Sequence, residues 1–163
     1  MPVRRLHNED WGFETNCFVC EPTNDHGLRI PFFHDDERAL VTAEFELSDA
    51  HSGAPTLVHG GVTLAVLDEA MAWACIAIGR QWAVTTQTSA TFQRAVRVGS
   101  LYRVEASVVD HVDGVMRTVA RVLDRRGELR VEAAASFATV GEAQATRLIG
   151  GDPGDRNRGF VND

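Results

Sequence analysis

The sequence predicts an α+β fold in which an antiparallel sheet of about six strands packs against one long helix. Residues 59–80 form an apolar stretch with helical periodicity, and much of the remaining chain alternates between apolar and polar residues in short segments. Short connections containing Gly and Asp join the later segments, which favours antiparallel neighbours. Because one helix covers only part of such a sheet, we expect a partner surface to cover the rest.

The composition indicates one globular domain. The chain has 163 residues, of which 44% are apolar and 24% are charged. Its net charge of -7 and its pI near 5.3 argue against general binding to nucleic acid or to anionic membranes. No apolar signal segment follows the N-terminus, and three cysteines, an odd number, do not suggest a disulfide framework. We therefore expect a cytoplasmic protein.

Asp68 and Glu69 are the only charged residues between His59 and Arg80. A membrane-spanning helix is the alternative interpretation, but two carboxylates near its centre would each cost roughly 2.5–3.5 kcal/mol on insertion. The stretch is therefore predicted to be a core helix. Neighbouring helix positions point about 100° apart, so we expect the two acids to occupy different environments, at least one of them solvated or paired.

Gly60 and Gly61 stand where this helix should begin. Glycine leaves backbone N–H groups unhindered at the positive end of the helix dipole, and such donors can stabilise an oxyanion. A plain glycine turn into the helix is the simpler interpretation, and the glycines alone favour it.

The rest of the chain divides into three parts. Residues 1–27 are a turn-rich N-terminal loop segment, residues 28–140 form the single domain, and residues 141–163 are a tail that we expect to be mobile. The strands of the domain are predicted from their alternation at residues 28–33, 41–47, 83–93, 100–110, 115–124 and 128–140.

The N-terminal segment carries a C-x-x-C motif at Cys17 and Cys20. The motif offers half of a zinc site, with His26 or His34 as further ligands, but a structural site normally shows four well-spaced ligands. A thioredoxin-like motif should open a helix in a βαβ unit, whereas this one leads into a proline and a glycine. We expect the sulfurs to pack as small hydrophobes and assign no metal.

Three motifs occur together in the chain: His-Gly-Gly at residues 59–61, an acid nine positions after the histidine at Asp68, and a strand that ends in Thr-Phe-Gln-Arg at residues 91–94. Together they resemble the hotdog-fold acyl-CoA thioesterases of the PaaI-like branch. The cysteine motif with the residues up to Leu28 is similar to a leader of many members. The resemblance covers roughly residues 17–140.

The resemblance implies a hotdog fold and a homodimer, or a pair of dimers forming a tetramer. The two sheets of a dimer would join edge to edge, with active sites at the interface between protomers. The implied reaction is hydrolysis of an acyl-CoA thioester to a carboxylic acid and free coenzyme A, without a cofactor or a metal. Nucleic acid and membranes are not expected as partners.

The resemblance also assigns catalytic roles. Asp68 matches the catalytic acid, as general base on water or as nucleophile, and Gly60 matches the residue whose N–H binds the thioester oxygen. Thr85, seven positions before Phe92, matches a hydroxyl residue that orients water, and His59 shapes the entry to the helix. A small shift in helix phase would exchange the role of Asp68 with that of Glu69.

One position departs from the family. Relatives often place Asn or Gln six positions before the histidine, where Gly53 stands in this chain. His51 or Ser52 would have to replace it from the same loop, or catalysis would be impaired.

Substrate binding is assigned to Gly53 and Gly61 near the helix start and to two arginines. Arg94 and Arg97 follow the predicted strand at 83–93 and are candidates to bind the phosphates of coenzyme A. The weaker candidates are Arg80, Arg125 and Arg126.

An acyl-CoA thioesterase is therefore the leading hypothesis. A hotdog dehydratase would place a catalytic histidine on the helix, whereas the next histidine after His59 is His111. The alternative from another class is a non-catalytic acyl-CoA-binding or regulatory module, which Gly53 favours.

Overall fold

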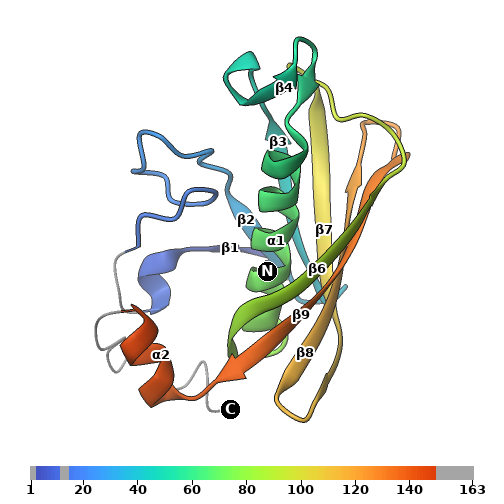
Figure 1. The fold of residues 1–163 in the computed structure, drawn as a ribbon. Helices are drawn as coiled ribbons and strands as arrows, with labels where there is room; N and C mark the ends of the chain where they lie inside the picture. Colours follow the sequence, from blue (N-terminus) through green and yellow to red (C-terminus); the bar gives the residue numbers. More distant parts are fainter. Residues whose placement is uncertain (1–2, 12–14, 150–163) are drawn as a thin grey trace.

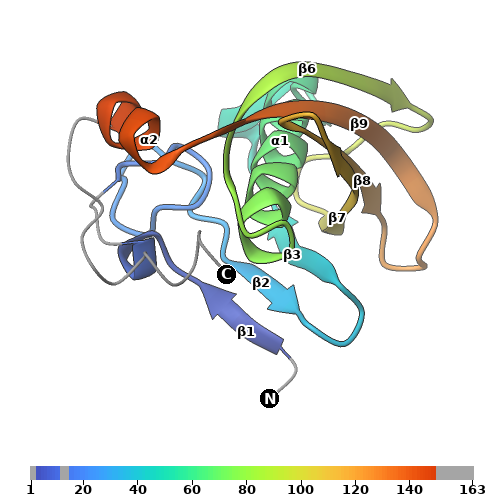
Figure 2. The ribbon, with the colours of Figure 1, turned by 90° about the horizontal axis from the view of Figure 1, so that it is seen from below.

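The computed structural model describes residues 3–11 and 15–149. A seven-stranded antiparallel sheet, in the order β1-β2-β3-β7-β8-β9-β6, curves around one helix, α1 (Gly60–Ala77) (Figure 2). The expected α+β architecture is confirmed, with seven strands in the main sheet. Its strands are β1 (Val3–Leu6), β2 (Phe32–Asp35), β3 (Leu40–Glu46), β6 (Trp82–Phe92), β7 (Leu101–Val112), β8 (Val115–Leu123) and β9 (Leu129–Val140).

The shorter elements lie at the ends of this sheet and helix (Figure 1). A hairpin of two short strands leads into α1. The elements are the 3-10 helices η1 (Asn8–Trp11) and η2 (Asp49–His51), the hairpin strands β4 (Ser52–Ala54) and β5 (Leu57–Val58), and a second helix, α2 (Glu142–Ile149).

Helix α1 is the centre of the core. Val66, Leu67, Ala70 and Met71 have no exposed surface, and the helix packs against strands β3, β6, β7, β8 and β9. By length and composition alone α1 is apolar enough to cross a membrane. Its packing inside the sheet identifies it as the core helix that the sequence predicts.

The ends of the chain differ from the expected loops. Within residues 1–27, Val3–Leu6 forms a strand that pairs with β2, so the N-terminal segment extends the sheet. In the tail, Glu142–Ile149 is helical, and Ala145 packs into the core. The expected mobility of residues 150–163 concerns a stretch outside the described residues.

Strand β6 forms one edge of the sheet and is exposed along much of its length. Val84 is 43% exposed and Phe92 is 44% exposed, although both are large and apolar. An unpaired edge that carries apolar side chains is a ready surface for pairing with another chain. This is where the expected partner surface would bind.

Candidate active site

The carboxylate of Asp68 and the hydroxyl of Thr85 lie together between α1 and β6, the strand at the edge of the sheet. Asp68 is half-buried in the middle of α1, and Thr85 on β6 donates a hydrogen bond to its Oδ1 at 2.8 Å. The sequence assigns both residues to the site, and the fold brings them into contact across 17 positions of the chain.

A bulge in β6 fixes the direction of Thr85. The register with β9 shifts between Thr85 and Gln87, and the Thr86 hydroxyl donates to the carbonyl oxygen of Ser136 at 3.0 Å. Thr85 is paired with Phe137, which is fully buried. Since directly opposite residues share a face of the sheet, Thr85 points toward the helix. A bulge is a common device for re-aiming a side chain near a site.

Glu69 occupies a different environment from Asp68, as the helix geometry predicts. Its Oε1 lies 3.3 Å from the Sγ atom of Cys17, on the side of α1 that faces the N-terminal segment. Burial raises the pKa of the Glu69 carboxyl to about 8. The carboxyl is therefore largely protonated near neutral pH, which makes Glu69 a poorer base for water than an ionised carboxylate.

His59 caps the helix and shapes its entry. Its Nδ1 accepts a hydrogen bond from the Gly61 N–H at 2.9 Å, and its carbonyl oxygen accepts from Val62 and Thr63 at 3.0 and 3.1 Å. Within the described part of the chain, the Gly60 N–H has no acceptor. The cap thus leaves one backbone donor free at the positive end of the helix.

The space beside Gly60 is open. A Cβ atom built at Gly60 would meet only the Phe92 ring, at 3.8 Å, which is an ordinary contact. Phe92 ends strand β6, so the same strand borders the helix start and, through Thr85, the carboxylate of Asp68.

Asp68 and the Gly60 N–H of one chain are too far apart to act on one carbonyl group. They stand eight positions apart on α1, and a rise of 1.5 Å per residue separates them by about 12 Å along the axis. One chain therefore does not bring these two groups to the same carbonyl group.

The hairpin before the helix leaves little room for a side chain at Gly53. A Cβ atom there would lie 3.1 Å from the Cα atom of His59. Of the two suggested replacements, Ser52 uses its hydroxyl to donate to the carbonyl oxygen of Asp49 at 2.7 Å. His51 keeps a buried Nδ1 that has no hydrogen-bond partner among the described residues.

The arginines separate into paired and unpaired ones. Arg94 forms an ion pair with Glu128 at 2.8 Å, so its charge is already compensated. Arg97 lines a cavity of about 300 Å³ together with Arg125 and Arg126. Within the described part of the chain, these three side chains form no ion pair. The remaining weak candidate, Arg80, lines a different cavity at the far end of α1.

Backbone contacts link the segment around Arg97 to the strand that precedes the helix. Val58, which precedes the capping histidine, donates its N–H to the carbonyl oxygen of Val96 at 2.9 Å, and Leu57 forms a β-bridge with Arg97. Arg130, which the sequence analysis missed, lines the same cavity as Arg97 and pairs with Asp124 at 2.8 Å. Arg130 stands in the alternating segment that forms β9, and the alternation alone does not distinguish it from other polar residues of a strand.

Comparisons with known proteins agree with this fold. Residues 56–131 match the family model of the thioesterase superfamily. The resemblance to hotdog-fold thioesterases is therefore confirmed. No curated protein gives a significant match.

Solved structures show the same fold at low sequence identity. A thioesterase superfamily protein superposes with a TM-score of 0.71 at 20% identity, over 76% of this chain and 60% of that one. The smu.793 protein of Streptococcus mutans, bound to acetyl-CoA, gives 0.59 at 18% identity, over 63% and 82% of the two chains. The PaaI protein of E. coli, from the phenylacetic acid degradation operon, gives 0.58 at 16% identity, over 63% and 74%. The chain thus spans 60% of the length of the first of these proteins.

Proposed function

We propose that the protein is an acyl-CoA thioesterase whose sites form between two copies of the chain. The observation that carries this proposal is the Thr85–Asp68 hydrogen bond of 2.8 Å on the open side of β6. The free Gly60 N–H, about 12 Å along the helix, supplies the second half of the site from the partner copy.

Asp68 acts as the general base in this proposal. Thr85 holds one carboxylate oxygen, which leaves the other free to accept a proton from water. The water oxygen adds to the thioester carbon, and the resulting oxyanion accepts a hydrogen bond from the Gly60 N–H of the partner copy. The C–S bond then breaks, the sulfur takes the proton from Asp68, and a carboxylic acid and free coenzyme A leave.

Neither a metal nor a cofactor is needed for this reaction. A thioester carbonyl is already electrophilic, so an oriented base and one aligned donor suffice to hydrolyse it. Glu69 has no part in it because its carboxyl faces Cys17.

The cavity beside Arg97 is proposed to hold the phosphates of coenzyme A. Arg97, Arg125 and Arg126 supply uncompensated positive charge there, and guanidinium groups match phosphate geometry. Arg94 is a weaker candidate because Glu128 neutralises it. Acetyl-CoA bound to the structurally similar Streptococcus mutans protein supports this class of ligand.

Pairing of two β6 edges is the proposed way of forming the dimer. Edge-to-edge pairing would cover Val84 and Phe92 and bring the helix start of one copy toward the open side of β6 in the other. Two such dimers forming a tetramer is the alternative assembly.

Two measurements test the function. Release of free thiol is followed with short, medium, long and aromatic acyl-CoAs, and binding of the same compounds is measured by calorimetry. Turnover supports the thioesterase. Binding without turnover would favour the non-catalytic acyl-CoA-binding module, for which Gly53 in place of a polar residue is the supporting observation.

Mixing two inactive variants tests whether the site is shared. Asp68→Asn removes the base and Gly60→Pro removes the N–H donor, so a dimer of one copy of each keeps one complete site if the site spans both chains. Random exchange of subunits at equal amounts should restore about a quarter of the parent activity. Mixtures as inactive as either variant alone would contradict a shared site.

A further inference from the structure

A cluster of three ligand-type side chains lies on the other side of α1 from the proposed catalytic pair. It comprises Cys17 and Cys20 of the N-terminal segment and Glu69 of the helix, whose donor atoms all lie within 4.8 Å of one another. The proposed hydrolysis uses none of them. His26 and His34, the ligands that the sequence offered, are not part of this cluster.

The loop that carries the two cysteines is held in place independently of Glu69. The Cys20 N–H donates to the Cys17 Sγ at 3.5 Å, and the N–H groups of Leu28 and Ile30 bond to the loop carbonyl oxygens of Phe18 and Val19 at 2.7 and 2.9 Å. The two sulfurs are therefore presented to the helix by a preformed backbone.

Asn24 ties this loop together from within. Its buried side chain donates to the carbonyl oxygen of Asn16 at 3.0 Å and accepts from the His26 N–H at 3.0 Å. Gly27 allows the close approach, because a Cβ atom there would lie 2.7 Å from the Phe18 carbonyl oxygen. The residues that the family resemblance includes in the leader thus build the cysteine loop.

We propose that Cys17, Cys20 and Glu69 bind one zinc-class divalent ion, with water in the fourth position. Thiolate and carboxylate are both zinc ligands, and four-coordinate tetrahedral sites are the rule for this ion. The ion would join the N-terminal segment to the helix, one residue away from Asp68.

The spacing of the donors fits such an ion. With Zn–S near 2.3 Å and Zn–O near 2.0–2.2 Å, a tetrahedral site separates sulfur from oxygen by about 3.5 Å. The Cys17 Sγ and Glu69 Oε1 atoms lie 3.3 Å apart. Small side-chain rotations therefore suffice to close the cluster around an ion.

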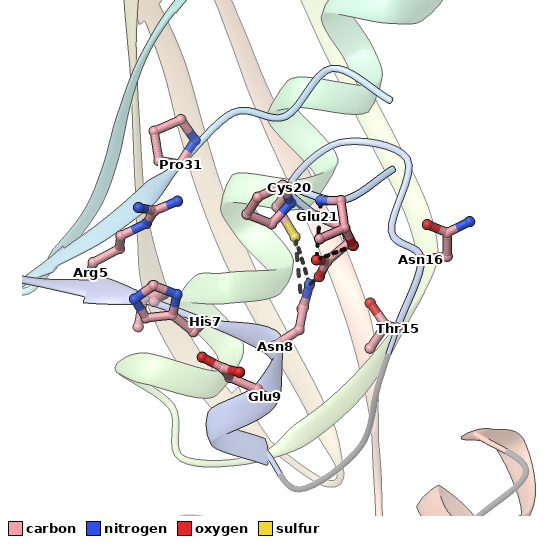
Figure 3. Close-up of a pocket in the computed structure, with 12 residues that line it drawn as sticks. Arg5, His7, Asn8, Glu9, Thr15, Asn16, Cys20, Glu21 and Pro31 are labelled. Atoms are coloured by element: carbon pink, nitrogen blue, oxygen red, sulfur yellow. Dashed lines mark hydrogen bonds between the residues drawn. The ribbon is translucent and has the colours of Figure 1, made fainter. Parts of the chain in front are cut away.

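A cavity lies beside Cys20. It has a volume of about 670 Å³, and Cys20, Asn8 and Glu21 are among its lining residues (Figure 3). The Asn8 amide nitrogen lies 3.4 Å from the Cys20 Sγ and donates to Glu21 Oε2 at 3.0 Å. Such hydrogen bonds around ligands orient them and tune the affinity for the metal.

The test is metal loading of the full chain. Protein produced in zinc-supplemented medium and purified without chelators should contain one zinc per chain by mass spectrometry. Replacement by Co²⁺ should give thiolate-to-cobalt charge-transfer bands and the visible bands of a tetrahedral ion. Loss of a hydrogen bond to a metal ligand typically lowers metal affinity by roughly 10–100-fold. Cys17→Ser, Cys20→Ser and Glu69→Gln each remove a ligand itself, so each should lower zinc affinity by more than this.

Cys75→Ala is the matched control. Cys75 is a buried thiol of the same helix that lies outside the cluster, so this variant should keep the metal. If a cluster variant fails to fold, thiol titration of the parent protein with and without metal takes its place. Two thiols should be protected by the metal and should become reactive when a chelator removes it.

Three results would overturn the proposal. The first is zinc-loaded parent protein with no bound ion and no cobalt charge-transfer band. The second is freshly isolated protein in which Cys17 and Cys20 form a disulfide. The third is metal that remains bound in the Cys17→Ser/Cys20→Ser double variant. None of these results depends on thioesterase activity.

Discussion

Removal of the Gly60 N–H tests the proposed oxyanion donor directly. Proline lacks the N–H and is well tolerated at the first position of a helix, which is where Gly60 stands. His59 has φ -56° and ψ 131°, values that suit a residue before proline. Gly60→Pro therefore deletes the donor while the start of the helix keeps its backbone conformation.

The expected magnitude follows from the chemistry of the donor. Loss of one oxyanion-stabilising hydrogen bond typically costs about 10²–10³ in kcat, or about 2.7–4 kcal/mol. Gly60→Ala is the matched control, because it keeps the N–H and its methyl group lies at an ordinary 3.8 Å from the Phe92 ring. We expect this control to remain within a few-fold of the parent rate.

The assay is steady-state release of coenzyme A thiol from the best substrate, with circular dichroism to show that each variant is folded. Gly60→Pro should lose kcat with little change in dimer formation. If Gly60→Pro retained the parent kcat while Gly60→Ala behaved normally, the Gly60 N–H would not be the oxyanion donor.

Further predictions follow from the same contacts. Thr85→Val removes a hydrogen bond to a carboxylate worth about 1.5–3 kcal/mol, so kcat should fall roughly 10- to 150-fold; an unchanged kcat would exclude the positioning role. Gly79→Ala places a methyl group 2.6 Å from a backbone carbonyl oxygen of α1 and should destabilise the fold by about 1–3 kcal/mol in urea unfolding, whereas Gly141→Ala, with open space around it, should not. Backbone hydrogen bonds, first that from Glu128, lower the pKa of Asp124, so its contribution to stability should be complete above about pH 5 and be lost as the pH falls through the lowered pKa. Asp124→Asn should therefore destabilise the protein more at pH 7 than at acidic pH; an equal effect throughout would contradict this.

The sequence predicts the elements well where periodicity is strong. The apolar stretch at residues 59–80 becomes α1 because its side chains fill the inside of the sheet, and the separation of Asp68 from Glu69 follows from the angle between neighbouring helix positions. Strand β1 was missed because Val3–Leu6 is short, largely exposed and stabilised by pairing with β2. Pairing of this kind leaves no periodic signal in the strand itself.

The candidate site is predictable only in part. The resemblance carried by the His-Gly-Gly motif and the acid spacing assigns His59, Gly60 and Asp68 to the proposed site. These residues lie at fixed distances along α1 and its N-cap. The Cys17–Glu69 contact spans 52 positions of the chain and depends on how the N-terminal segment packs against α1. No local pattern encodes such a contact, so the third ligand of the cysteine cluster emerged only from the fold.

The most direct test of the account compares thiol release by the parent, Asp68→Asn and Glu69→Gln proteins with one acyl-CoA substrate. Loss of a general base typically costs about 10²–10⁴ in rate. If Asp68 is the general base, the rate should fall by this amount for Asp68→Asn and should change much less for folded Glu69→Gln. A parent-like rate for Asp68→Asn, or a collapse confined to Glu69→Gln, would contradict it.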